Sequence, residues 1–158
     1  MRVMTGVALV LLLAFLPARS PAQSPTPPPS GVPIQVEDAW ARAAPLMPAM
    51  GAMPMSGGTG AVYLTLRNGG AEPETLVGAA SDAAETVELH ETIQDGAVMR
   101  MRPVAQLVIP AGTVLAMKPG GLHLMLINLK RALRPGEQVA VTLTFAHAAP
   151  LTVQVPVR

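Results

Sequence analysis

The sequence predicts an all-β protein, a sandwich or barrel of about eight short strands. Many short segments alternate apolar and polar residues with the period of two that is typical of strands. Gly, Pro and Asn residues that favour turns separate these segments at short intervals. No segment combines a sustained helical periodicity with helix caps. Many short strands joined by turns are typical of β-sandwiches and β-barrels.

Each predicted strand either alternates or is dense in β-branched residues. In chain order the strands are 34–40, 61–68, 86–92, 97–102, 113–118, 122–129, 139–145 and 151–157. Asn68-Gly69-Gly70 is a turn signal that ends the second strand, and Asp95-Gly96 predicts a hairpin between the third and the fourth. Pro-Gly turns at 110–112, 119–121 and 135–136 separate the later strands.

The N-terminal region is predicted to lie outside this domain. An arginine, the apolar run 3–16 and small residues before a cut after Ala22 are typical of an export signal. The run is too short for a lasting membrane span, although an uncleaved anchor is the alternative, and the chain has no cysteine to acylate. We therefore expect a signal peptide at 1–22, a Pro- and Ser-rich linker at 23–33 and one folded domain at 34–158, soluble and periplasmic.

Composition excludes several classes of function. The net charge of +1 and the four aromatic residues Trp, Tyr and Phe argue against nucleic-acid binding, which needs a basic face and stacking rings. The absence of cysteine excludes disulfides, thiolate catalysis, iron–sulfur ligation and the thiolate of blue-copper sites. No grouping of carboxylates, of Ser with His and Asp, or of glycines suits acid–base catalysis, hydrolysis or phosphate binding. We expect a binding protein, with no enzymatic turnover.

Histidines and methionines share strand faces. In the sixth predicted strand, alternation places His123 and Met125 opposite the leucines, with their Cα atoms about 7 Å apart. In the third strand, His90 likewise points away from the apolar residues. Met99 and Met101 share one face of the fourth strand, which the hairpin turn brings beside His90. Imidazoles and thioethers are therefore expected to lie close together.

Such a ligand set is borderline to soft. Thioether sulfur is a poor ligand for zinc, calcium or magnesium and a good one for Cu(I), which needs no anionic ligand. A neutral site near the surface can also release its metal to a thiolate acceptor. The sequence therefore predicts Cu(I) binding.

The spacing of these residues resembles a known family. His90 is followed by ten residues, Met101, twenty-one residues and then His123-x-Met125, as in the periplasmic copper chaperone family whose domain is called PCu(A)C. The segments that resemble the family are 38–45, 61–70, 87–104, 109–139 and the strand that follows, and the match covers roughly 34–157. The resemblance implies that His90, Met101, His123 and Met125 ligate Cu(I) in a cupredoxin-like β-sandwich.

The resemblance also implies a biological role. The family delivers copper toward the dinuclear copper site of cytochrome oxidase, so the expected partners are the oxidase copper-site subunit, a Sco-type thiol protein, or both. Copper buffering or resistance with the same ligands is one alternative, and a metal-free interaction module is another. We expect a monomer without stable membrane insertion.

The remaining methionines and the third histidine have weaker assignments. Many family members carry a His- and Met-rich C-terminal tail, whereas this sequence ends in Pro-Val-Arg and has a Met-rich segment earlier in the chain. That segment is either a disordered or packing loop or a second, weaker copper site or lid, and its methionines are Met47, Met50, Met53 and Met55. For Met99, core or rim packing is favoured over a role as a spare ligand. We expect Met117 to pack in the core and His147 to be exposed.

Overall fold

A computed structural model describes residues 34–46, 57–96 and 98–158. The predicted signal peptide, the predicted linker and the methionines of 47–55 lie outside the described residues. The described part is all-β, as predicted, and contains no helix long and apolar enough to cross a membrane. Its strands are β1 (Ile34–Ala41), β2 (Gly60–Asn68), β3 (Glu74–Ser81), β4 (Ala84–Asp95), β5 (Val98–Pro103), β6 (Leu107–Ile109), β7 (Val114–Ala116), β8 (Leu122–Leu129), β9 (Gln138–Phe145) and β10 (Leu151–Pro156).

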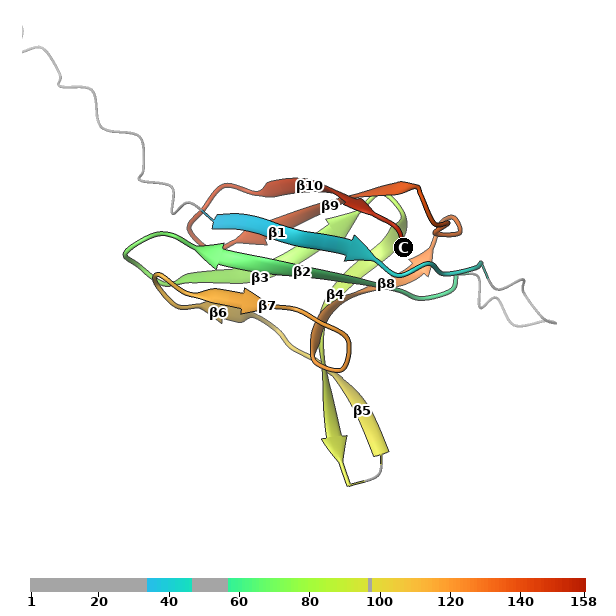
Figure 1. Cartoon of the computed structure of the whole chain (residues 1–158), viewed down its shortest axis with the longest axis horizontal. Helices are drawn as coiled ribbons and strands as arrows, with labels where there is room; N and C mark the ends of the chain where they lie inside the picture. Colours follow the sequence, from blue (N-terminus) through green and yellow to red (C-terminus); the bar gives the residue numbers. More distant parts are fainter. Residues whose placement is uncertain (1–33, 47–56, 97) are drawn as a thin grey trace, which may run out of the picture.

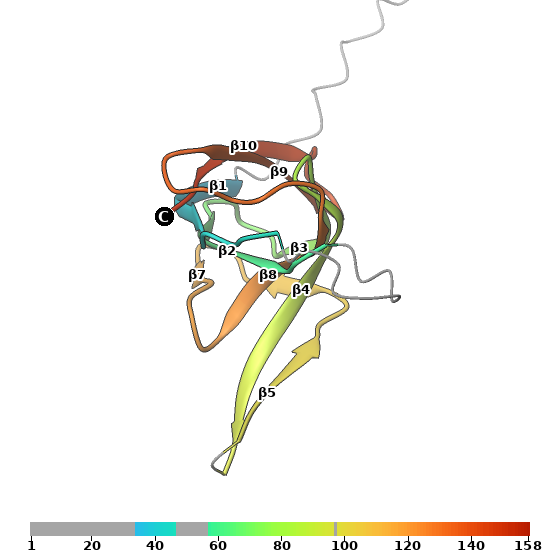
Figure 2. The same ribbon diagram turned by 90° about the vertical axis from the view of Figure 1, so that its right-hand side faces the viewer.

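The strands form one sheet that curls into a flattened, nearly closed barrel (Figures 1 and 2). The strand order is β1-β2-β8-β4-β3-β9-β10, with β5 beside β4, β6 beside β3 and β7 beside β2. A parallel bridge between Ala41 and Val157 joins the two ends of this order, and the Arg158 N–H donates to the Ala41 carbonyl at 2.9 Å. The two layers of the predicted β-sandwich are thus parts of one continuous sheet.

The core follows from strand alternation. Leu124 and Leu126 of β8 are fully buried inside the barrel, as the predicted leucine face requires. Leu124 lies opposite Val62 of β2, and the burial of each such side chain contributes about 1.5–3 kcal/mol. Met117 is also buried, so its predicted packing role is confirmed. The other large side chains that are fully buried include Leu66, Leu76, Ile109, Leu133, Val139, Val141 and Leu143.

Two strands of the structure were absent from the predicted set. β3 contains Gly78 and neighbouring alanines, and its pairing with β9 is irregular between Leu76 and Gly78. Small residues and an irregular register weaken the alternation that identifies a strand in sequence. β6 has only three residues, which is too short for a periodic signal. The structure therefore has more strands than the eight or so that the sequence predicted.

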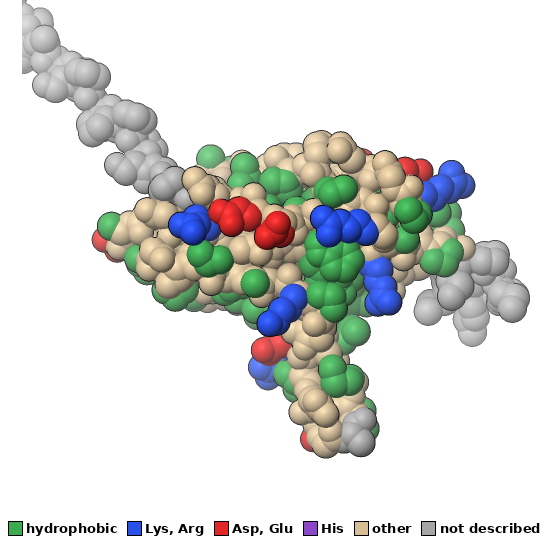
Figure 3. Space-filling model, viewed as in Figure 1, with side chains coloured by type: hydrophobic (Ala, Val, Ile, Leu, Met, Phe, Trp, Pro, Cys, Tyr) green, Lys and Arg blue, Asp and Glu red, His purple; other side chains and the backbone are tan. Residues whose placement is uncertain are grey.

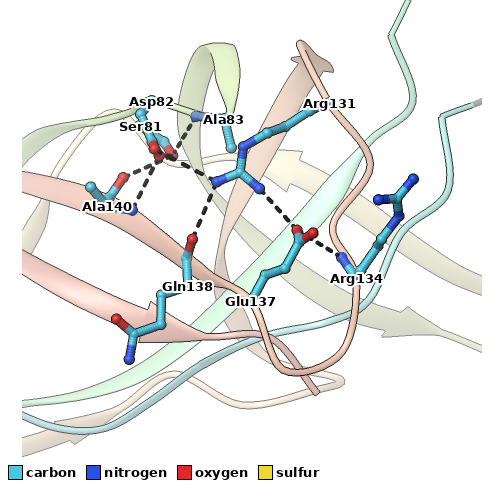
Figure 4. Close-up of polar contacts among 8 residues, drawn as sticks. All are labelled: Ser81, Asp82, Ala83, Arg131, Arg134, Glu137, Gln138 and Ala140. Atoms are coloured by element: carbon cyan, nitrogen blue, oxygen red, sulfur yellow. Dashed lines mark hydrogen bonds and ion pairs between the residues drawn. The ribbon is translucent and has the colours of Figure 1, made fainter.

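Side-chain contacts fix the turn between β3 and β4 against β9 (Figure 4). The Asp82 carboxylate accepts the Ala140 N–H at 3.1 Å, and the Ser81 hydroxyl donates to the Ala140 carbonyl at 2.9 Å. Arg131, after β8, donates to Glu137 at 3.1 Å and lies 3.6 Å from Asp82. These contacts join segments far apart in the chain at one end of β4.

The other end of β4 leaves the barrel. β4 and β5 form the predicted hairpin around Gly96, which has a φ of 62° in the left-handed region that glycine tolerates. The outer half of β4 and all of β5 project from the body as a two-stranded arm (Figures 1 and 2). On the face drawn in Figure 3, hydrophobic side chains continue from the body onto this arm.

Candidate metal centre

The register of β4 and β8 brings the two histidines together. His90 lies directly opposite His123 in the antiparallel ladder, and the centroids of their rings are 6.0 Å apart. In the same ladder Glu88 lies opposite Met125. Residues two apart on a strand share a face, so all four side chains lie on the face of the sheet away from the leucine core.

Hydrogen bonds determine which ring nitrogen of each histidine is left unprotonated in the neutral form. His123 is buried, and its Nδ1–H donates to the Gly121 carbonyl at 3.0 Å, because a carbonyl oxygen can only accept. This leaves a lone pair on Nε2. His90 donates from Nε2–H to the Glu88 carboxylate at 2.9 Å, which leaves the lone pair on Nδ1. Such contacts typically orient metal-binding histidines.

The Nδ1 atom of His90 has a further property. It is buried and has no hydrogen-bond partner, the only such side-chain nitrogen or oxygen among the described residues. A buried acceptor without a partner costs free energy in the folded protein, about 1–3 kcal/mol. An exception of this kind needs an explanation, and binding of an ion or a water molecule is a common one.

The hairpin adds thioethers to the same face. Met101 lies opposite Thr92 and Met99 opposite Gln94, while His90 lies opposite Pro103. Because Thr92 is two residues after His90, Met101 is the diagonal neighbour of His90, within reach of a long side chain. Both hairpin methionines point to the same side as the histidines, as strand parity predicted.

An open hollow of about 440 Å³ lies between the hairpin and the body of the sheet. We call it the site hollow. Its lining residues are Arg42, Ala43, Ala44, Thr59, Gly60, Ala61, Tyr63, Thr92, Met99, Met101, Pro119, Gly120, His123 and Met125. Three of the four predicted ligands therefore line one space, and the fourth, His90, adjoins it through its contact with His123. No group of three His, Cys, Asp or Glu side chains suited to a metal occurs within the described residues.

Aromatic rings cover the inner side of this space. Tyr63 of β2 is buried on the site face, with its ring centroid 6.2 Å from that of His123. Trp40 of β1 packs on Tyr63 at 4.6 Å, and the Arg158 guanidinium lies 5.8 Å from the Trp40 centroid. The Tyr63 ring thus lies beside His123, and Trp40 packs on Tyr63. The sequence contained no signal that Tyr63 adjoins the histidine.

Glu88 was also missed as a site residue. Its contact with His90 follows from parity, since the two residues are two apart on β4. The signal was therefore present in the sequence, although a carboxylate is not among the soft ligands that favour Cu(I).

His147 lies elsewhere and is exposed, as predicted. Its ring contacts the buried Glu74 carboxylate at 3.2 Å. Burial alone would raise the pKa of Glu74, but hydrogen bonds from Thr75, Ala148 and His147 outweigh it and lower that pKa below its ordinary value. This second cluster stabilises the turn after β9 and contains no thioether.

Comparisons with known proteins agree with the geometry. Residues 34–157 match the family described as "Putative lipoprotein LpqE-like". The chain belongs to the LpqE-like family. One relative, "Putative lipoprotein Lxx21020" of Leifsonia xyli subsp. xyli, is 36% identical over 126 residues, which cover 79% of this chain and 69% of the relative. Another, "Uncharacterized protein RP573" of Rickettsia prowazekii, is 34% identical over 54% of this chain and 48% of its own length.

Solved structures with the same fold include copper proteins. The solution structure of CuI-DR1885 from Deinococcus radiodurans has a TM-score of 0.58 and 33% identity, and the match covers 82% of this chain and 80% of that one. The copper-bound PCuAC domain from PmoF2 has a TM-score of 0.58 over 79% and 92% of the two chains, and at 23% identity it supports the fold alone. The predicted PCu(A)C membership and the cupredoxin-like β fold are confirmed.

Proposed function

We propose that this member of the LpqE-like family binds one Cu(I) ion as cargo and passes it to a protein acceptor. The proposed ligands are His90, Met101, His123 and Met125. The observation that carries the proposal is the unpartnered, buried Nδ1 of His90 beside His123, at the edge of a hollow lined by methionines. A metal ion bound there supplies the partner that the protein itself does not.

The donor set favours Cu(I) over other metals. Two neutral imidazoles and two thioethers provide soft to borderline ligands without a negative charge, which suits a monovalent d10 ion. In the neutral form, hydrogen bonds place the lone pair on a defined nitrogen of each imidazole, Nδ1 of His90 and Nε2 of His123. The relative whose structure is titled CuI-DR1885 adds support, since it is 33% identical over most of this chain.

Exchange with an acceptor is consistent with the exposure of the site. His123 is buried, whereas Met101 is 62% exposed on the projecting arm. An approaching thiolate can therefore reach the metal from the side of Met101 without unfolding the barrel. We propose that the acceptor is the copper-site subunit of cytochrome oxidase or a Sco-type thiol protein, and that the protein acts as a monomer.

The location follows from the N-terminal sequence. Residues 1–22 have the composition of an export signal, so we propose that the domain functions in the periplasm. Both the family description and the name of the Leifsonia relative contain the word lipoprotein, and this sequence contains no cysteine. Export as a soluble protein is thus part of the proposal.

The test is an anaerobic titration of residues 23–158 with Cu(I) in competition with a chromophoric chelator. The variant His123→Ala/Met125→Ala removes two ligands of the hollow, and His147→Ala is the matched control because His147 lies outside it. We expect one tight equivalent in the wild type and in the control, and its loss in the double variant. Chelator retention of all copper in the presence of the wild type would refute the proposal.

Delivery requires a separate measurement. In a strain that lacks the gene, loss of oxidase activity in low copper supports delivery. Sensitivity that appears only in high copper contradicts delivery and indicates buffering.

A further inference from the structure

Met99 does not have the environment of a core residue. Its side chain is 57% exposed, whereas that of the core methionine Met117 is 3% exposed. This exposure excludes the core position for Met99 and leaves a rim position or a role as a ligand. A thioether that lines a hollow and remains largely in solvent gains little from burial, so its position needs another explanation.

The hairpin directs Met99 toward the site hollow. Along β5 the methionines alternate with Arg100 and Arg102, which lie on the opposite face of the arm. Arg100 pairs with Asp95 at 3.1 Å and Arg102 with Glu91 at 2.8 Å. The register of β4 and β5 determines which face carries the arginines, and these exposed ion pairs contribute little stability. The thioethers consequently face the body of the domain.

The space opposite the arm is left open by glycine. The Thr92 N–H donates to the Gly121 carbonyl at 3.1 Å, so the chain before β8 runs beside the base of the hairpin. Gly120 lines the hollow there without a side chain to fill it. The arm therefore carries two thioethers, Met99 and Met101, across from His123 and Met125.

We propose that Met99 is a transient ligand that holds Cu(I) at the mouth of the site hollow during capture and release. This inference rests on the proposed function. In the step, a bond from the Met99 sulfur to Cu(I) forms as the bond from Met125 breaks, and the bonds from His90, His123 and Met101 remain. Copper stays in the Cu(I) state, and no electron or proton moves. The reverse exchange seats the ion on the floor of the hollow.

This role has a kinetic signature. A ligand used only during passage stabilises the intermediate and leaves the end states unchanged. Its loss slows capture and release by the same factor, so the dissociation constant, which is their ratio, stays constant. A permanent ligand behaves differently, because its loss lowers the affinity.

The decisive variant is Met99→Leu, which removes sulfur but preserves apolar volume. Met101→Leu is the matched permanent-ligand variant on the same strand face, and Met117→Leu is the control for a methionine outside the site. Stopped-flow mixing with Cu(I) and with a chromophoric chelator gives the capture and release rates, and equilibrium competition gives the affinity. For Met99→Leu we expect both rates to fall about tenfold with an unchanged affinity.

Two results would overturn this role while leaving the proposed function intact. The first is that Met99→Leu captures and releases Cu(I) at the same rates as the wild type. The other is an affinity loss as large as that of Met101→Leu, which would make Met99 a permanent ligand. Failure of the wild type to bind Cu(I) would instead refute the proposed function and this role together. A second readout is the ¹³C-methyl signal of Met99, which should broaden at substoichiometric Cu(I) and sharpen at one equivalent.

Discussion

Two parts of the domain each place a histidine against a glutamate. They differ in whether every buried polar atom has a hydrogen-bond partner within the protein. The fully buried Glu74 carboxylate accepts N–H groups of Thr75 at 2.7 Å, of Ala148 at 2.8 Å and of His147 at 3.2 Å, and it also contacts the His147 ring. At the His90–Glu88 pair, the second ring nitrogen of His90 has no partner.

The difference separates a structural cluster from a binding site. A buried carboxylate with a full set of donors stabilises the folded chain and requires nothing else. An unpartnered nitrogen on a face lined with thioethers lowers stability until a ligand occupies it. The residue types alone therefore do not distinguish a binding site from a structural cluster. Whether each buried polar atom has a hydrogen-bond partner distinguishes them better.

The largest expected effect concerns the His90–Glu88 pair, which the comparison assigns to metal binding. His90→Ala should lower Cu(I) affinity by more than about 100-fold, the upper end of what changes around metal ligands cost. The same change should alter the free energy of unfolding without metal by only about 1 kcal/mol, since it removes an unsatisfied atom. Chelator competition and urea unfolding of the apo protein measure the two quantities. A large loss of apo stability with intact affinity would reverse the assignment.

Glu74→Gln tests the structural side. The amide places N–H groups against backbone donors that the carboxylate satisfies, so we expect a loss of about 2–3 kcal/mol in the free energy of unfolding. Cu(I) affinity should not change, because Glu74 lies outside the site hollow. His147→Ala is the control, and it should cost less than about 1 kcal/mol because that ring is largely exposed.

The contribution of Glu74 to the free energy of unfolding should depend on pH. The pKa of Glu74 is lowered from 4.5 in the folded state, because backbone hydrogen bonds outweigh the opposing effect of burial. The folded state therefore binds the proton less readily than the unfolded state. The resulting stability is complete above pH 4.5 and is lost as the pH falls through the lower folded pKa. The difference between wild type and Glu74→Gln should shrink over that range, and a difference independent of pH would contradict this account.

Much of the site could be predicted from the sequence, because strand alternation is a strict local rule. It placed His90, His123 and Met125 on one face, and the Asp95-Gly96 signal placed the hairpin methionines beside them. Burial and pairing in three dimensions could not be predicted. Nothing in the sequence showed that Met99 would be exposed on a projecting arm.

The same limit applies to the rest of the fold. β3 was missed because glycine, alanines and an irregular register obscure its periodicity. Glu74 begins that strand, so its burial and its contact with the turn after β9 could not be anticipated either. Residues whose role depends on contacts between distant segments are those that periodicity does not reveal.

The smallest predicted effect concerns Glu88, which connects the two sides of the comparison, since it is a carboxylate that orients a histidine for a ligand. Without Glu88, either nitrogen of His90 can carry the proton, so part of the protein presents the wrong atom to the metal. Glu88→Ala should therefore lower Cu(I) affinity by about tenfold, the lower end for an outer-shell partner. Nitrogen-15 NMR of the apo imidazole should show His90 changing from a single tautomer to a mixture.

Glu91→Ala separates orientation from general electrostatics. Glu91 follows His90 on the same strand, but it lies on the opposite face and pairs with Arg102. The Glu91→Ala substitution removes the same negative charge as Glu88→Ala, close to His90 in the chain, but it leaves the contact with the imidazole in place. If Glu91→Ala costs as much affinity as Glu88→Ala, negative charge near the cation is responsible. If only Glu88→Ala changes both the tautomer and the affinity, a carboxylate prepares His90 for copper before the metal arrives.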